Sequence, residues 1–313
     1  MRDRPEGRAR PRAEGVLTEI LDASRPLNVT KLAELSDLNR AEAEVFRKKW
    51  EDVPVERRRD IISRMAELAE DNFDLDFARV FLAVIQDRDP AVRSVAASGL
   101  VLSEESEVVA PLVRLLTQDE SEPVRIAAAL SLGKFVLQGE LGKIGAVQTE
   151  RAREALLRVV EDRRSSPELR RRSLESVSPW SSPRVTELIA NAFRSTEPGF
   201  KASAIYSMGM NCDARWLPAL FSEMASEDAR LRYESAHAAG EIAEPSALPH
   251  LFPLLRDDDI EVRVAAIWAL GQIGGKASKE ALRRLQGDPD EKVRDAIEQA
   301  LSEIALGDDT LPM

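Results

Sequence analysis

The stretch DIEVRVAAIWALGQIG, residues 259–274, decides the fold of this chain because its pattern returns at a nearly fixed interval. An acidic residue is followed by an apolar–basic pair and then by small and apolar residues at helical spacing. The basic residue of the pair recurs at intervals of 32, 45, 31, 31, 31 and 31 residues. We name these seven residues the anchors: Arg93, Arg125, Arg170, Lys201, Arg232, Arg263 and Arg294. Such a period is typical of solenoid proteins, in which each unit packs only against its neighbours.

Each repeat predicts a pair of helices, the second of which carries the anchor. Four residues before the anchors, six of the seven positions hold a good N-cap residue, such as Asp259, whose oxygen can accept from a free first-turn N–H group. Small residues follow at the third and sixth positions after the anchor and apolar ones at the seventh, so the helices can approach closely and share a core. We therefore predict an all-α, right-handed α-solenoid (superhelix) of about seven to eight antiparallel helix pairs.

The domain organisation follows from where this pattern begins and breaks. Large apolar residues such as Ile61 and Met65 precede the regular repeats and favour a terminal capping unit. The 45-residue interval carries an excess stretch with three glycines, LQGELGKIGAVQTE, which predicts an inserted loop. Whether this loop serves binding or is tolerated variation stays open. The predicted parts are a disordered basic tail at 1–14, an N-terminal helical cap at 15–73, the repeats at 74–306 with an insertion at 137–150, and a C-terminal tail at 307–313.

The composition of the chain disfavours several classes of protein. The net charge of −11 opposes nonspecific attraction to nucleic acid or anionic membranes. One cysteine and two histidines leave few ligands for a metal site. The first 15 residues lack an apolar core and the chain has no run of 18 apolar residues, so we expect neither a secretory signal nor a membrane span. We expect the protein to be cytoplasmic. A non-catalytic role is favoured, and we expect no catalytic residues, no metal and no cofactor.

The repeats resemble HEAT repeats, and endings such as that at Trp268–Ile273 are similar to the short subclass found in phycobilin lyases. The resemblance covers roughly residues 75–304 and implies a fold shared by scaffolds, transport adaptors, bilin lyases, a hydroxylase and DNA glycosylases. Deoxyhypusine hydroxylases place His-Glu pairs after the anchors to hold iron, and this chain has none there. The acidic balance, 21 acids against 12 basic residues from Thr196 onward, disfavours a DNA glycosylase.

On each second helix, the positions one and five residues after the anchor lie opposite the buried positions three, six and seven residues after it. We therefore predict that these two positions form the exposed face of the helix. In HEAT arrays the second helices line the concave side. The candidate partner-binding residues on this face are Ile126, Leu130, Tyr206, Tyr233, His237, Val264 and Trp268. Packing between repeats is the alternative role for these rings. The anchors themselves are predicted to be structural, bonding neighbouring repeats through Asp side chains or backbone carbonyls.

The leading hypothesis is a protein- or peptide-binding scaffold or adaptor that uses the concave face, centred on Tyr206–Trp268. Aromatic residues that lose their water on binding are frequent hot spots of interfaces. The alternative is a lyase or chaperone-like protein that handles a bilin or another tetrapyrrole. Nucleic-acid binding is the least favoured function because of the charge. The oligomeric state and the identity of the partner stay unknown from the sequence.

Overall fold

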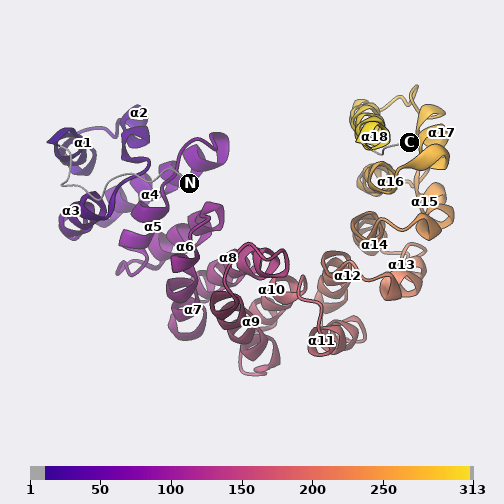
Figure 1. Cartoon of the computed structure of the whole chain (residues 1–313), viewed down its shortest axis with the longest axis horizontal. Helices are drawn as coiled ribbons and strands as arrows, with labels where there is room; N and C mark the ends of the chain where they lie inside the picture. Colours follow the sequence, from indigo (N-terminus) through magenta and orange to yellow (C-terminus); the bar gives the residue numbers. More distant parts are fainter. Residues whose placement is uncertain (1–10, 311–313) are drawn as a thin grey trace. The chain divides into compact units, whose positions relative to one another are not determined.

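The computed structural model describes residues 11–310, and within that range the chain forms helices and turns but no β-strand (Figure 1). The predicted all-α solenoid is confirmed. The chain divides into two compact units, residues 1–176 and 177–313. We call them unit 1 and unit 2 and describe each by itself.

Unit 1 begins with two short helices and continues as a series of helix pairs. Helices α3 and α5 pack together, as do α4 and α6, and α8 then packs on α6 and α7. The predicted cap therefore contains a pair, α3 and α4, that stacks in the same way as the later repeats. The helices are α1 Pro11–Leu21, α2 Val29–Leu32, η1 Ala33–Leu35, α3 Arg40–Trp50, α4 Val55–Asp71, α5 Ala78–Val84, α6 Pro90–Gly99, η2 Leu100–Leu102, η3 Ser106–Val108, α7 Val109–Gln118, α8 Glu122–Glu140, α9 Ala146–Glu161 and α10 Pro167–Val177.

Unit 2 is a regular stack in which the even-numbered helices pack on one another. Helix α12 contacts α14, α14 contacts α16 and α16 contacts α18, while each also packs against its own first helix (Figure 1). Small residues make this stacking possible, since a Cβ added to Gly209 would lie 2.8 Å from the Ala238 Cα. The helices are α11 Pro183–Phe193, α12 Phe200–Asn211, η4 Ala214–Trp216, α13 Leu217–Glu223, α14 Ala229–Ile242, η5 Pro245–Ala247, α15 Leu248–Leu254, α16 Ile260–Ile273, α17 Gly275–Arg283 and α18 Glu291–Thr310.

The inserted loop predicted at 137–150 is wrong, because most of the excess residues lengthen two helices. Helix α8 runs to Glu140 and α9 begins at Ala146, which leaves only residues 141–145 between them. Gly139 lies inside α8 where α9 crosses it, and a Cβ there would be 2.2 Å from the Thr149 Cγ2. Gly142 has a φ of +66° and lies in the turn between the helices. The glycines therefore permit a close helix contact and a tight turn.

Both predicted tail boundaries also need correction. Helix α1 begins at Pro11, a residue favoured at the first helical position, so residues 11–14 are helical. At the other end α18 passes through Gly307 and continues to Thr310, since the first proline after it is Pro312. Residues 1–10 of the predicted basic tail and residues 311–313 lie outside the described range.

Candidate functional site

The anchors hold successive repeats together where they are paired with an aspartate of the next turn. Arg93 donates from Nε and Nη2 to the two carboxylate oxygens of Asp119 at 2.7 and 2.8 Å. Arg232 binds Asp257 in the same bidentate way, at 2.7 Å for both bonds. Each anchor also donates from Nη1 to carbonyls of its own turn, those of Asp87 and Ser226 at 2.8 and 2.9 Å. One guanidinium thus fixes two turns.

The aspartate partners occupy the same position in each of these repeats, six residues before the next anchor. We call this set of equivalent positions the aspartate column; it was not predicted from the sequence. The other function of these aspartates is to accept from the backbone N–H two residues later, as Asp257 does from Asp259 at 2.9 Å. Asp87 belongs to this column and pairs with Arg58, which makes Arg58 a further anchor. Arg58 follows Arg57 and not an apolar residue, so the apolar–basic rule passed over it. The ion pair with Arg232 lowers the pKa of Asp257 below its usual range.

The remaining anchors use other contacts. Arg263 and Arg294 donate from Nη1 to carbonyls of the preceding turn, each at 2.8 Å. Arg125 and Arg170 donate from Nε to the carbonyls of Leu116 and Val160. Lys201 forms an ion pair with Glu223 at 3.1 Å and lies over the Phe193 ring.

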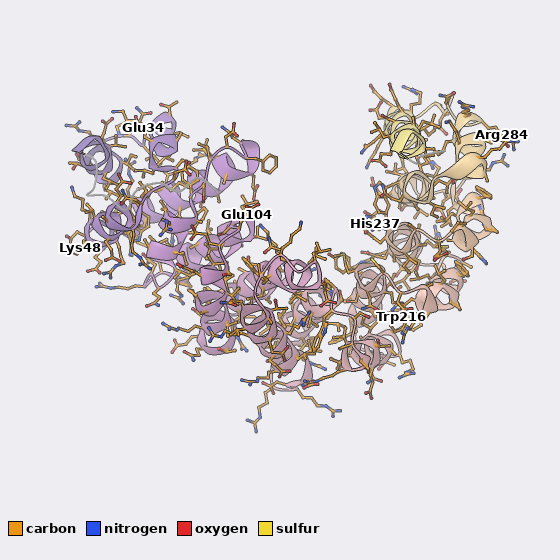
Figure 2. The ribbon with its side chains drawn as sticks, viewed as in Figure 1. Glu34, Lys48, Glu104, Trp216, His237 and Arg284 are labelled. Atoms are coloured by element: carbon orange, nitrogen blue, oxygen red, sulfur yellow. The ribbon has the colours of Figure 1, made fainter. Side chains whose placement is uncertain are left out.

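The outward side of the second helices in unit 2 is formed by three columns, one, five and nine residues after each anchor. The first two columns are those of the sequence analysis, and the third follows from a further step of four residues along the helix. We name these twelve residues the second-helix face: Ala202, Tyr206, Met210, Tyr233, His237, Glu241, Val264, Trp268, Gln272, Asp295, Gln299 and Glu303. Figure 2 labels His237 on this side of unit 2 and Arg284 on the opposite side, which the first helices form.

Aromatic rings lie together at the centre of the second-helix face. The His237 ring is parallel to that of Trp268, with centroids 4.1 Å apart and an interplanar angle of 8°. Tyr233 is 6.3 Å from His237. On α12, Tyr206 is 41% exposed. We call Tyr206, Tyr233, His237 and Trp268 the aromatic stripe. The rings of Tyr233, His237 and Trp268 contact one another, and all four rings of the stripe keep solvent-accessible surface.

A glycine makes room for this arrangement. A Cβ on Gly240 of α14 would lie 2.6 Å from Cζ3 of Trp268 and 2.8 Å from the Cα of Ala269. Trp268 therefore lies directly against the α14 backbone. The rings serve both the packing between repeats and the solvent-accessible surface.

The imidazole of His237 is neutral near physiological pH, because its pKa is lowered. Burial lowers the pKa of its imidazole, and the carboxylate of Glu241, 3.9 Å from Nδ1, opposes this only in part. A neutral imidazole stacks on Trp268 without the cost of a buried charge.

The other predicted residues lie at two places. Val264 is half-buried on α16, one turn before Trp268. Leu130, which is 46% exposed, and the half-buried Ile126 lie on α8 of unit 1. They form an apolar strip of their own on that unit.

Among the described residues, no group of three or more His, Cys, Asp and Glu side chains is placed to hold a metal ion. The thiol of Cys212 has a pKa raised by burial, which disfavours the thiolate. Within residues 11–310, no helix combines the length and apolar character needed to cross a membrane.

A search of solved structures matches this chain to several helical proteins. Yeast importin-beta matches with a TM-score of 0.56 at 12% identity, over 94% of this chain and 46% of the importin chain. The CpcE–CpcF complex of phycocyanin lyase from Nostoc sp. PCC7120 gives 0.48 at 20% identity, over 72% and 94% of the two chains. Human deoxyhypusine hydroxylase gives 0.38 at 19% identity, over 94% and 96%. At 12% identity the likeness to importin-beta shows the fold alone.

Comparison with curated proteins gives no match. A family model for HEAT repeats matches residues 78–164 and 217–302, which together make up more than half of the chain. These two stretches contain the Arg93–Asp119 and Arg232–Asp257 pairs and most of the second-helix face. The chain therefore belongs to the HEAT-repeat family.

Proposed function

We propose that this protein is a non-catalytic scaffold or adaptor that binds another protein or a peptide on the second-helix face of unit 2. The observation that carries this proposal is the aromatic stripe, three of whose four rings contact one another while all of them keep accessible surface. Rigid aromatic rings that are already held in place bind with little loss of side-chain entropy. They are also the side chains that most often carry the energy of an interface.

The regular stack of unit 2 supports the proposal. Because α12, α14, α16 and α18 pack side by side, the stripe crosses successive repeats and offers a continuous surface to an extended segment. The predicted concave shape of this face stays a prediction. The tetrapyrrole alternative also stays a prediction, and a visible-absorbance titration of the protein with a bilin tests it.

Quantitative capture of partners tests the proposal. The full chain is immobilised, and proteins retained from a cell extract are compared between the wild type and the variant Tyr233→Ala/Trp268→Ala. We expect the variant to lose the specifically retained protein. The matched control is Phe252→Ala/Leu285→Ala, which removes half-buried apolar side chains from a cavity between α15 and α17 on the other side of unit 2.

Trp268 is half-buried, so its removal can also disturb folding. Tyr206→Ala serves as the second variant, because this ring is the most exposed of the stripe. Reduced capture by both stripe variants, with helicity and melting preserved in Tyr206→Ala, supports the proposal. Equal capture by the wild type and Tyr206→Ala, or equal losses in stripe and control variants, would overturn it.

A further inference from the structure

We infer that the partner segment recognised by the second-helix face of unit 2 is basic, and that a Lys or Arg side chain of it lies at the aromatic stripe beside Glu241 and Glu303. This inference rests on the proposed function and names the chemistry of the partner. It follows from the distribution of charge along four helices.

The second helices of unit 2 carry no Lys or Arg after their anchors. Beyond Lys201, Arg232, Arg263 and Arg294, the Lys and Arg residues of α12, α14, α16 and α18 are Arg230 and Lys292, which both precede the anchor of their helix, and Lys292 pairs with Glu261. The anchors do not neutralise the face, because their charged groups are held in the turns: Arg232 pairs with Asp257, and Arg263 and Arg294 donate to carbonyls. The face therefore presents the carboxylates of Glu241, Asp295 and Glu303 without a cation of its own.

Glu303 is a carboxylate positioned by neutral groups. Gln272 of α16 donates from Nε2 to one carboxylate oxygen at 2.9 Å, and Gln299 donates to the other at 3.3 Å. Amide donors fix the orientation of the carboxylate but leave its charge uncompensated. An incoming ammonium or guanidinium group would thus meet an acceptor that is already in place.

Glu241 is the second carboxylate without a basic partner. The ionisable groups near it are His237, whose imidazole is kept neutral by burial, and Cys212, whose thiol pKa is raised by burial and by Glu241, so neither supplies a cation. Other acidic residues of unit 2 do have cations: Glu223 pairs with Lys201, and Glu261 pairs with Lys292. Glu241 and Glu303 thus lie on the face that also carries the rings, and neither is paired with a Lys or Arg there.

The aromatic rings also favour a basic partner segment. The face of an aromatic ring attracts cations, and Trp does so most strongly. Tyr206, Tyr233 and Trp268 lie on α12, α14 and α16, which stack in this order and are followed by α18, so a single extended segment can contact both the rings and the carboxylates of α14 and α18. An acidic peptide or a nucleic acid backbone would instead meet like charge, which disfavours both.

Defined probe peptides test the inference with the full chain. One fluorescein-labelled peptide carries alternating Lys and Arg residues between Ser and Leu, and its twin carries Glu at the same positions. Fluorescence anisotropy measures the dissociation constant of each at low and at physiological salt, since screening weakens exposed charge pairs. We expect binding of the basic peptide and none of its acidic twin.

The decisive comparison uses two variants with the same change in net charge. Glu241→Gln/Glu303→Gln removes two carboxylates of the face, and we expect it to raise the dissociation constant of the basic peptide about tenfold or more. Glu244→Gln/Glu280→Gln removes two exposed carboxylates away from the face, and we expect less than about a twofold effect. Circular dichroism and thermal melting check that both variants fold.

Each outcome separates this inference from the proposed function. Equal weakening by both pairs shows attraction to overall charge and overturns the inference, as does equal binding of the acidic twin. If Glu241→Gln/Glu303→Gln leaves peptide binding unchanged while Tyr233→Ala/Trp268→Ala and Tyr206→Ala lose partner capture, the proposed function holds and the basic partner is wrong. If the stripe variants keep capture, the proposed function itself fails.

Discussion

Gly240 illustrates at the scale of one residue how the repeat makes room for the site. In an exposed helix interior, Gly→Ala stabilises a protein by up to about 1 kcal/mol. At Gly240 the new methyl group would lie 2.6 Å from Cζ3 of Trp268 and 2.8 Å from the Ala269 Cα, so either ring or backbone must move. Overpacking of this kind typically costs about 1–3 kcal/mol. We predict that Gly240→Ala lowers the free energy of unfolding, measured by chemical denaturation.

The matched control for this prediction is Gly15→Ala in α1. A Cβ at Gly15 has no heavy atom within 4 Å, so only the gain in helix propensity remains and the variant should be unchanged or more stable. An equal response of the two glycines would contradict the direct contact between Trp268 and the α14 backbone.

The Arg232–Asp257 pair predicts coupled losses of stability. The two side chains are 17% and 8% exposed, and their bonds are bidentate. Removing one partner of a largely buried pair leaves the other charge uncompensated, so we expect Arg232→Met and Asp257→Asn to lose about 2–4 kcal/mol each. A double-mutant cycle should give a coupling energy of about 1–3 kcal/mol. The exposed Arg215–Asp213 pair is the control, and Arg215→Met should change stability by less than about 1 kcal/mol.

The same pair predicts a pH dependence whose sign follows from linkage. Arg232 lowers the folded-state pKa of Asp257, so the folded protein binds fewer protons at this group than the unfolded chain does. The stabilisation is present above the unfolded pKa of about 4 and is lost as the pH falls through the lower folded pKa. Arg232→Met should therefore flatten the loss of stability below about pH 4, measured by urea unfolding at each pH.

His237 gives a residue-scale readout of the face by NMR. Its imidazole should titrate below the usual pKa, because burial against Trp268 lowers the pKa more than Glu241 raises it. Glu241→Gln removes the opposing charge, so it should lower the pKa of His237 further. A higher pKa in this variant would show that burial does not dominate at this ring.

At the scale of elements, the contact between α8 and α9 depends on Gly139. The two helices are 19 and 16 residues long, and Thr149 lies where a side chain at 139 would be. We predict that Gly139→Val separates their adjoining ends and raises amide hydrogen exchange around residues 137–150. Gly142→Ala changes the turn instead, where φ is +66° and nothing lies within 4 Å of the added Cβ, and should leave the helix contact protected. Equal exchange in both variants would argue against this helix contact.

The helix pairs could be predicted from the sequence because the repeat shows which columns are buried. The loop at 137–150 could not, since glycine marks both a turn and a close contact, and only the position of Thr149 on the next helix distinguishes them. The pair α3–α4 was assigned to a cap because its large residues Ile61 and Met65 differ from the small residues of later repeats. Its anchor, Arg58, has an aspartate partner that becomes visible only when the turns are placed side by side.

At the scale of the whole molecule, positions that hold the same kind of residue in every repeat determine the fold. Positions whose residue type differs from repeat to repeat carry the candidate site. The stripe residues were predicted from two columns, while the carboxylates of Glu241 and Glu303 lie in a third column that the sequence analysis did not follow. Their lack of a basic partner depends on contacts between helices, which a sequence does not display. The net charge of −11 describes the whole chain, whereas the absence of Lys and Arg after the anchors of α12, α14, α16 and α18 describes one face.

Site-specific cross-linking tests the binding face most directly. A photoreactive phenylalanine analogue replaces Tyr206 on the second-helix face or, as the control, Lys276 on α17, whose side chain is 91% exposed. After irradiation in cell extract, we predict a discrete cross-linked partner from position 206, its loss in the Tyr233→Ala/Trp268→Ala background, and no such product from position 276. The same partner cross-linked equally from both positions, or a product from position 276 alone, would contradict the assignment of the second-helix face as the docking surface.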